Sequence, residues 1–210
     1  MNIIKPQNLK PDQLYISDFS ILQKDEKLSY YNFKNESHNN VSANEIEFEH
    51  CRFNNICIQN GKLEKFTFMD AVFDKCNFSN TAFSECAFIR CEFKNCKVFG
   101  CNLSENRLYN VSFTDTNAGY ISFSLTSIEN VVFKDTILNN SYFMETKNKN
   151  LYFDSADLTQ SRFLKTSLKN VDLSNSKIEG IAITAEDIKG AIIDRFQASD
   201  LLYLLDVKIK

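Results

Sequence analysis

The chain has 210 residues, a net charge of −3 and 43% hydrophobic residues, a size and composition typical of one soluble domain. Its first residues lack the apolar run of a signal peptide, and no stretch approaches the roughly 18 uncharged apolar residues of a membrane span. We therefore expect a cytoplasmic protein that makes no membrane contact.

Residues 1–44 follow no strict repeat and are predicted to form an N-terminal cap. The repeats that come next would expose unpaired strand edges and apolar side chains at their free end, so a covering segment is needed there. The apolar residues available for this are Leu14, Phe19, Ile21, Leu22, Tyr30 and Tyr31.

Residues 45–184 carry a large apolar residue at almost every fifth position, from Phe48 to Ile183. Only Ala118 and Asn148 break the series, and Asn148 is expected to mark a local bulge or a hydrogen-bonded turn. A second inward candidate, usually small or apolar, lies two residues before each of these positions. The predicted structural core consists of Phe73, Phe78, Phe83, Phe88, Phe93, Phe113, Phe133 and Phe153.

A period of five excludes the two ordinary regular structures. Residues five apart on a helix step by 140° and scatter over every face, whereas an odd spacing on a flat strand sends successive side chains to opposite sides. A chain that turns a corner every five residues keeps all these side chains inside. Four sides make a square coil of 20 residues, and the repeat region gives about seven coils stacked at about 4.8 Å.

The repeat units resemble the pentapeptide-repeat family over about two thirds of the chain. Stretches such as Ala71-Val72-Phe73-Asp74-Lys75 and Ala156-Asp157-Leu158-Thr159-Gln160 match the motif of that family. The resemblance implies an all-β solenoid, namely a right-handed quadrilateral β-helix, here with an N-terminal cap and a C-terminal helix.

Seven cysteines raise the question of a metal site or of disulfide bonds. Zinc ligand pairs are usually two to four residues apart, whereas Cys86, Cys91, Cys96 and Cys101 follow the five-residue period. Six of the seven, all but Cys57, occupy the small inward position, where a thiol acts as an apolar filler. We predict free thiols in the core and no metal.

Residues 185–210 are predicted to form a C-terminal helical segment that mediates dimerisation. Thr184 begins a capping box, and Asp194 precedes a second apolar helix. This helix is either a lid over the last coil or the interface of a symmetric dimer. The resemblance to Qnr-type quinolone-resistance members of the family favours a homodimer through Phe196, Leu201, Leu202, Leu204 and Leu205.

The sequence offers no catalytic set, so we expect a binding protein without a cofactor rather than an enzyme. The two histidines, His38 and His50, have no nucleophile or carboxylate at a recognisable spacing and are expected to be solvated. Phosphate-binding loops and hydrolase motifs are absent from the sequence.

The gyrase-protecting members of the family imply a rod that imitates a DNA duplex and binds DNA gyrase or topoisomerase IV without contacting nucleic acid itself. Such a rod needs outward carboxylates that replace phosphates in a basic groove. We call the wall centred on Phe53, Phe73, Phe93, Phe113, Phe133, Phe153 and Leu173 the acidic wall. Its candidate partner-binding residues are Asp74, Glu92, Asp115, Asp135, Asp154 and Asp172, and its C-terminal half has a net charge of −3.

A non-catalytic scaffold with an unrelated protein partner is the alternative. The repeat region as a whole has a net charge of only −1, which suits a partner that binds through apolar contacts. No insertion breaks the repeat phase, so the chain is more similar to loop-free members from Gram-positive bacteria than to members with projecting loops. The apolar outward residues are Ile89, Phe99, Tyr109, Tyr120, Leu125, Tyr142, Met144, Tyr152 and Leu164.

Overall fold

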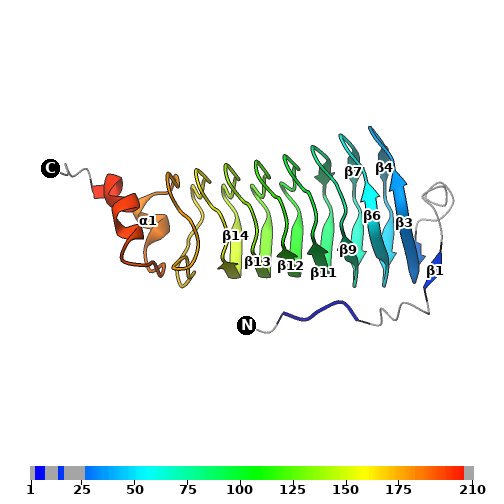
Figure 1. Cartoon of the computed structure of the whole chain (residues 1–210), viewed down its shortest axis with the longest axis horizontal. Coiled ribbons are helices and arrows are strands. Elements are labelled where there is room, and N and C mark those ends of the chain that lie inside the picture. Colours follow the sequence, from blue (N-terminus) through cyan, green and yellow to red (C-terminus); the bar gives the residue numbers. More distant parts are fainter. Residues whose placement is uncertain (1–2, 8–13, 17–26, 206–210) are drawn as a thin grey trace.

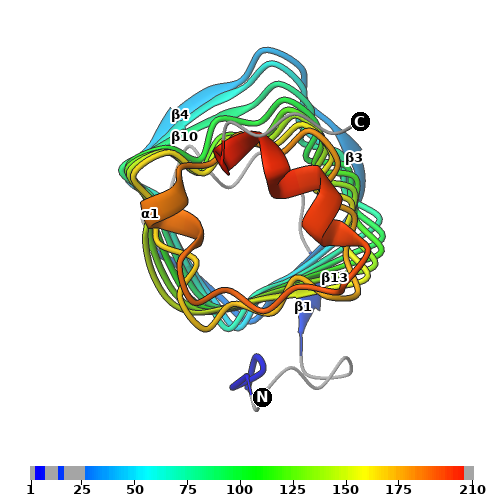
Figure 2. The same cartoon turned by 90° about the vertical axis from the view of Figure 1, so that its left-hand side faces the viewer.

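The computed structural model describes residues 3–7, 14–16 and 27–205. Viewed from the side, the chain forms a rod of stacked coils, and viewed along its axis the coils superpose as a closed tube (Figures 1 and 2). The four-sided solenoid expected from the five-residue period is confirmed. The strands are β1 (Tyr15–Ile16), β2 (Lys27–Ser29), β3 (Tyr31–Ser37), β4 (Ser42–Asn44), β5 (Glu47–Glu49), β6 (Arg52–Cys57), β7 (Lys62–Glu64), β8 (Thr67–Met69), β9 (Val72–Asp74), β10 (Ala82–Ser84), β11 (Ala87–Lys94), β12 (Arg107–Thr114), β13 (Ser127–Lys134) and β14 (Lys147–Asp154).

Every pair of strands is parallel, and beyond β1 each pairs with a strand one coil away. Phe93 faces Phe113, which faces Phe133, which in turn faces Phe153. Main-chain hydrogen bonds join neighbouring coils, and isolated bridges carry this pairing on toward the C-terminus, as far as Asp172 and Ile192. A shift of twenty residues per coil follows directly from four sides of five residues.

The corners are made by residues in the left-handed conformation. One recurs at every fifth position from Tyr30 to Asn170, with φ between 49° and 65° for the residues other than glycine. Asn, Asp and Gly, which accept this conformation at the lowest cost, fill many of these corners. The left-handed residue is the local reason why the chain bends once in each repeat.

The core is a stack of phenylalanine rings inside the tube. Along the acidic wall, Phe73 and Phe93 stack with ring centroids 4.4 Å apart, and Phe93 and Phe113 follow at 4.7 Å. All eight phenylalanines expected in the core are buried. Asn148 occupies its core position without a bulge, because β14 keeps its register and the side-chain amide donates to the carbonyl of Ser167 at 2.9 Å.

The coiled region starts earlier than the sequence indicates. Strands β2, β3 and β4 pair in register with β5, β6 and β7, so residues 27–44 already form coils although they fall inside the predicted cap. Leu28 and Phe33 are fully buried in these coils.

The C-terminal end is covered by α1 (Ala185–Ile188) and the 3₁₀ helix η3 (Gln197–Leu205), which lie across the last coil in Figure 2. Thr184 caps α1 by accepting a hydrogen bond from the Asp187 amide. The predicted second helix is present, but it adopts the tighter 3₁₀ form.

Candidate functional site

The acidic wall runs along β9, β11, β12, β13 and β14, where each strand places its centre inward and the residues on either side outward. Asp115 and Asp135 follow β12 and β13 and sit at left-handed corners, both with φ of 49°. Because the strands pair in register, the backbones of these two residues lie one coil apart, at about the strand spacing of 4.8 Å. Aspartate suits this position because its short side chain tolerates the left-handed backbone.

Three carboxylates of the acidic wall are exposed and form no ion pair with any residue that the structure describes: Asp115, Asp135 and Asp172. The amide and the hydroxyl of Ser174 donate to Asp172, and these hydrogen bonds lower the pKa of that carboxyl below its ordinary value. The C-terminal half of this wall therefore presents uncompensated negative charge.

The carboxylates of two further candidates, Asp154 and Asp74, interact with other side chains of the rod. Asp154 lies 3.8 Å from the ammonium of Lys134 and accepts a hydrogen bond from Asn175 at 2.8 Å. Asp74 is half-buried and accepts from Asn95 at 3.1 Å. Both carboxylates remain on the acidic wall but are less available to a partner.

Glu92 differs from its prediction as an outward partner-binding residue. Its residue exposure is 7%, and its carboxylate lies 2.5 Å from the ammonium of Lys94, two residues along the same strand. The Lys94 side chain neutralises this carboxylate, so Glu92 is not part of the exposed array.

A buried charge cluster that the sequence did not indicate lies at the corner formed by His50, Asp70, Arg90 and Asn110. Asp70 is only 2% exposed and accepts two hydrogen bonds from the Arg90 guanidinium, at 2.7 and 2.6 Å. Burial by itself would raise the pKa of Asp70, but the hydrogen bonds from Arg90 and from the Gln7 amide outweigh it and lower the pKa.

The histidine of this corner also departs from its prediction as a solvated residue. The side chain of His50 is 12% exposed, stacks on Tyr30 with ring centroids 4.8 Å apart, and donates to the carbonyl of Gln7. His38 is more open and lies 3.0 Å from the Glu36 carboxylate.

The predicted dimer residues fall into two groups. Leu201 and Leu204 pack against the end of the core within the same chain, as a lid would. Phe196 is 71% exposed, with the Arg195 guanidinium 4.4 Å from its ring centroid, and Leu202 is half-buried. The side chain of Leu205 lies outside the described residues.

Six cysteines are buried, Cys57 is half-buried and all seven are free. Burial raises the pKa of the Cys86 thiol to about 11, and thiols such as Cys86 and Cys91 donate to main-chain carbonyls. Across the described ranges, no three His, Cys, Asp or Glu side chains gather into a group that could hold a metal ion. In the same ranges, no helix has the length and apolar character needed to cross a bilayer.

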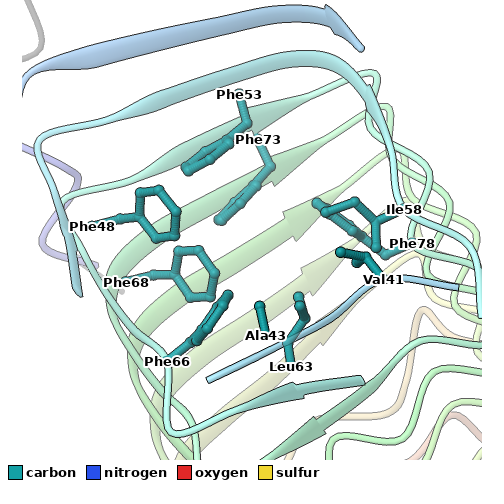
Figure 3. A pocket seen from close by; sticks show the side chains of 10 residues that line it. All are labelled: Val41, Ala43, Phe48, Phe53, Ile58, Leu63, Phe66, Phe68, Phe73 and Phe78. Atoms are coloured by element: carbon teal, nitrogen blue, oxygen red, sulfur yellow. The ribbon is translucent and has the colours of Figure 1, made fainter. Parts of the chain in front are cut away.

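The tube contains an apolar cavity of about 20 Å³ near its N-terminal end, shown in Figure 3. Its lining is purely hydrophobic and includes Phe48, Phe66 and Phe78. A space of this size holds no more than about one water molecule and offers it no polar partner. The cavity is a packing gap beside the bulky Phe66, which fills a position that is usually small, and not a ligand site.

Residues 66–138 match the family model described as "Pentapeptide repeat region". Among curated proteins, none matches the chain significantly. QnrB1, described as a plasmid-mediated fluoroquinolone resistance protein, is 18% identical in one trypsin-treated structure, with a TM-score of 0.42 over 88% of this chain and 91% of QnrB1.

Two cyanobacterial proteins are also similar. HetL from Nostoc, a pentapeptide repeat protein involved in heterocyst differentiation regulation, is 13% identical, with a TM-score of 0.40 over 80% of this chain and 90% of HetL. Rfr23 from Cyanothece is 15% identical, with a TM-score of 0.23 over 84% and 97%. The left-handed corner and the inward apolar residue recur in successive coils through the matched region, so residues 66–138 form a pentapeptide repeat region.

Proposed function

We propose that this protein is a non-catalytic DNA mimic that binds a type II topoisomerase, DNA gyrase or topoisomerase IV, and protects it from quinolones or inhibits it. The observation that carries the proposal is the array of exposed carboxylates on one wall of the rod, Asp115, Asp135 and Asp172, which form no ion pair with a residue that the structure describes. A basic groove built for duplex phosphates attracts such an array by the same long-range field. With a topoisomerase as its partner, the protein would act in the cytoplasm.

The test is a supercoiling assay with purified gyrase and a quinolone. Wild-type protein is expected to restore supercoiling at low concentration or to inhibit it at higher concentration. Replacing Asp115, Asp135 and Asp172 with Asn should slow association by about tenfold and flatten its salt dependence. Asn accepts the left-handed corners at positions 115 and 135 as well as Asp does, and an amide oxygen at position 172 can still accept from the Ser174 amide, so the fold of this variant should be retained.

The matched control replaces Glu105 and Glu179 with Gln and Asp157 with Asn. These three acids lie on other walls, and the change in net charge is the same as in the first variant. Equal weakening by both variants would show that total charge matters and the acidic wall does not. A wild-type protein that neither rescues nor inhibits supercoiling would remove the topoisomerase proposal.

A scaffold function is the second candidate, and a group of exposed apolar residues favours it. Tyr120 is 49% exposed, Leu125 54% and Ile137 45%, and the ring of Phe99 lies 5.3 Å from that of Tyr120. Binding through this surface would change little with salt, whereas binding through the acidic wall would weaken as salt is added.

We further propose that two rods join end to end through the C-terminal segment as a homodimer. The exposed apolar residues at this end are Ile192, Phe196 and Tyr203. A twofold contact between two such ends would place two acidic walls on one continuous rod.

A further inference from the structure

Residues 3–7 run outside the coils and parallel to the rod axis, and Figure 1 shows them beneath the coils. We call this segment the strap. We propose that the His50–Asp70–Arg90–Asn110 corner is a peptide-binding site whose ligand is the extended main chain of the strap.

The contacts use the main chain of the strap. The amide of Gln7 donates to Asp70 at 3.0 Å, and its carbonyl accepts from His50, also at 3.0 Å. Toward the other end, the amide of Ile4 donates to the Asn110 side chain at 3.4 Å. Gln7 and Ile4 are both exposed residues, so their side chains contribute little burial to this docking.

The spacing of the site fits an extended chain. The pairing of Met69 with Ile89 and of Ile89 with Tyr109 places Asp70 and Asn110 two coils apart, or about 9.6 Å. Three residues of extended chain, from Gln7 back to Ile4, cover about 10 Å. The spacing of the Gln7 and Ile4 amides on the strap therefore matches the spacing of Asp70 and Asn110 on the rod.

The sequence of the N-terminal segment suits an extended ligand. The chain has two prolines, Pro6 and Pro11, and Pro6 lies between the two docked residues. Proline fixes its own φ and holds the preceding residue extended, which lowers the entropy lost on docking.

Asp70 is what distinguishes this corner from an ordinary one. A carboxylate at an outward corner should be solvated, as Asp115 and Asp135 are, yet Asp70 is 2% exposed. The Gln7 amide and the Arg90 guanidinium satisfy its two oxygens. The two Arg90 hydrogen bonds, which do not involve the strap, orient the carboxylate, and its Oδ1 atom also accepts the backbone amide of Gln7.

Hydrogen exchange on the full-length chain tests the site, read at the Ile4 amide, which donates to Asn110. Gln7→Pro removes the donated Gln7 amide without altering the rod and should make the Ile4 amide exchange about tenfold faster, the loss expected for a hydrogen bond to a charged acceptor. Gln7→Ala keeps the amide and should leave the exchange unchanged. Asp70→Asn should also speed the exchange, whereas Asp74→Asn, in the same coil on the acidic wall, should not.

Unchanged exchange at β12 and β13 would show that the coils stay intact in these variants. The proposal is overturned if Ile4 exchanges in the wild type as fast as in a free peptide, or if Gln7→Pro and Gln7→Ala behave alike. Protection that increases with protein concentration would also overturn it, because the strap would then come from a second copy. Loss of gyrase binding would not affect any of these readouts.

Discussion

The inward phenylalanine is the main stabilising unit of the coil. Phe113 is 1% exposed and stacks between Phe93 at 4.7 Å and Phe133 at 4.9 Å. Phe113→Ala would leave a cavity that the hydrogen-bonded coils above and below cannot close. We expect the free energy of unfolding to fall by about 3–5 kcal/mol in chemical denaturation. Ser112→Ala, at the outward neighbour on β12, should change it little, and a similar loss in both variants would contradict the stacked core.

Asp70 gives the rod a pH-dependent contribution to stability. Its pKa in the folded chain is lowered, so the contribution is complete above the ordinary aspartate pKa and is lost as the pH falls through the folded value. We expect wild type to be more stable than Asp70→Asn at pH 7, with the difference shrinking steadily below about pH 4. Thermal unfolding at a series of pH values measures this. A stability difference that grows toward acid pH would contradict the assigned hydrogen bonds.

The sequence predicts which residues point inward, but it does not predict that the outward carboxylates Glu92 and Asp70 are buried. The five-residue period identifies Phe73 and Phe93 as inward, because every coil repeats the same geometry. The burial of Glu92 depends on where the Lys94 side chain lies, and the burial of Asp70 depends on a main-chain amide 63 residues away in sequence. Neither contact leaves a periodic signal in the sequence.

The C-terminal lid, formed by α1 and η3, supplies hydrogen-bond partners that the last coil would otherwise lack. The Gln197 side chain donates to the carbonyls of Leu173 and Ser176, at 2.7 and 2.6 Å. The Tyr203 hydroxyl donates to the carbonyl of Ile181 at 2.6 Å and accepts from the amide of Ile183. In the interior of the rod a following coil fills these roles, so the lid replaces the next coil.

Tyr203→Phe tests this role of the lid. Removing the hydroxyl should lower the free energy of unfolding by about 0.5–1.5 kcal/mol and should speed hydrogen exchange at the Ile183 amide. Tyr152→Phe is the matched control, because that side chain is exposed on the acidic wall and its hydroxyl has no recorded partner within the described residues. If the Ile183 amide exchanges at the same rate in both variants, the lid does not cap the coil through Tyr203.

The start of the coiled region could not be predicted from the sequence pattern alone. Leu28 and Phe33 keep the five-residue period, but Ala43 is too small to stand out as an inward residue. Because β4 pairs with β7, Ala43 lies opposite Leu63 and therefore on the inner face of the coil. The strand pairing, rather than the residue size, decides that residues 27–44 belong to the coils.

The C-terminal end of the rod differs from its walls because it exposes apolar side chains rather than charged ones. Leu201 and Leu204 pack against the core, whereas Phe196 stays 71% exposed and Ile192 52% exposed. Exposed apolar groups at the end of a rod favour contact with an identical end, since a twofold axis makes the patch complementary to itself.

Phe196→Asp separates dimerisation from folding, because Phe196 projects away from the core while Leu201 packs on it. We expect the wild type to be a dimer by light scattering at micromolar concentration, and Phe196→Asp to be a monomer with an unchanged unfolding transition. Leu201→Asp should instead loosen the lid and lower the unfolding temperature, so the two variants distinguish an interface residue from a core residue. A wild-type protein that is monomeric under these conditions would leave each acidic wall on its own short rod, and the end-to-end arrangement would be wrong.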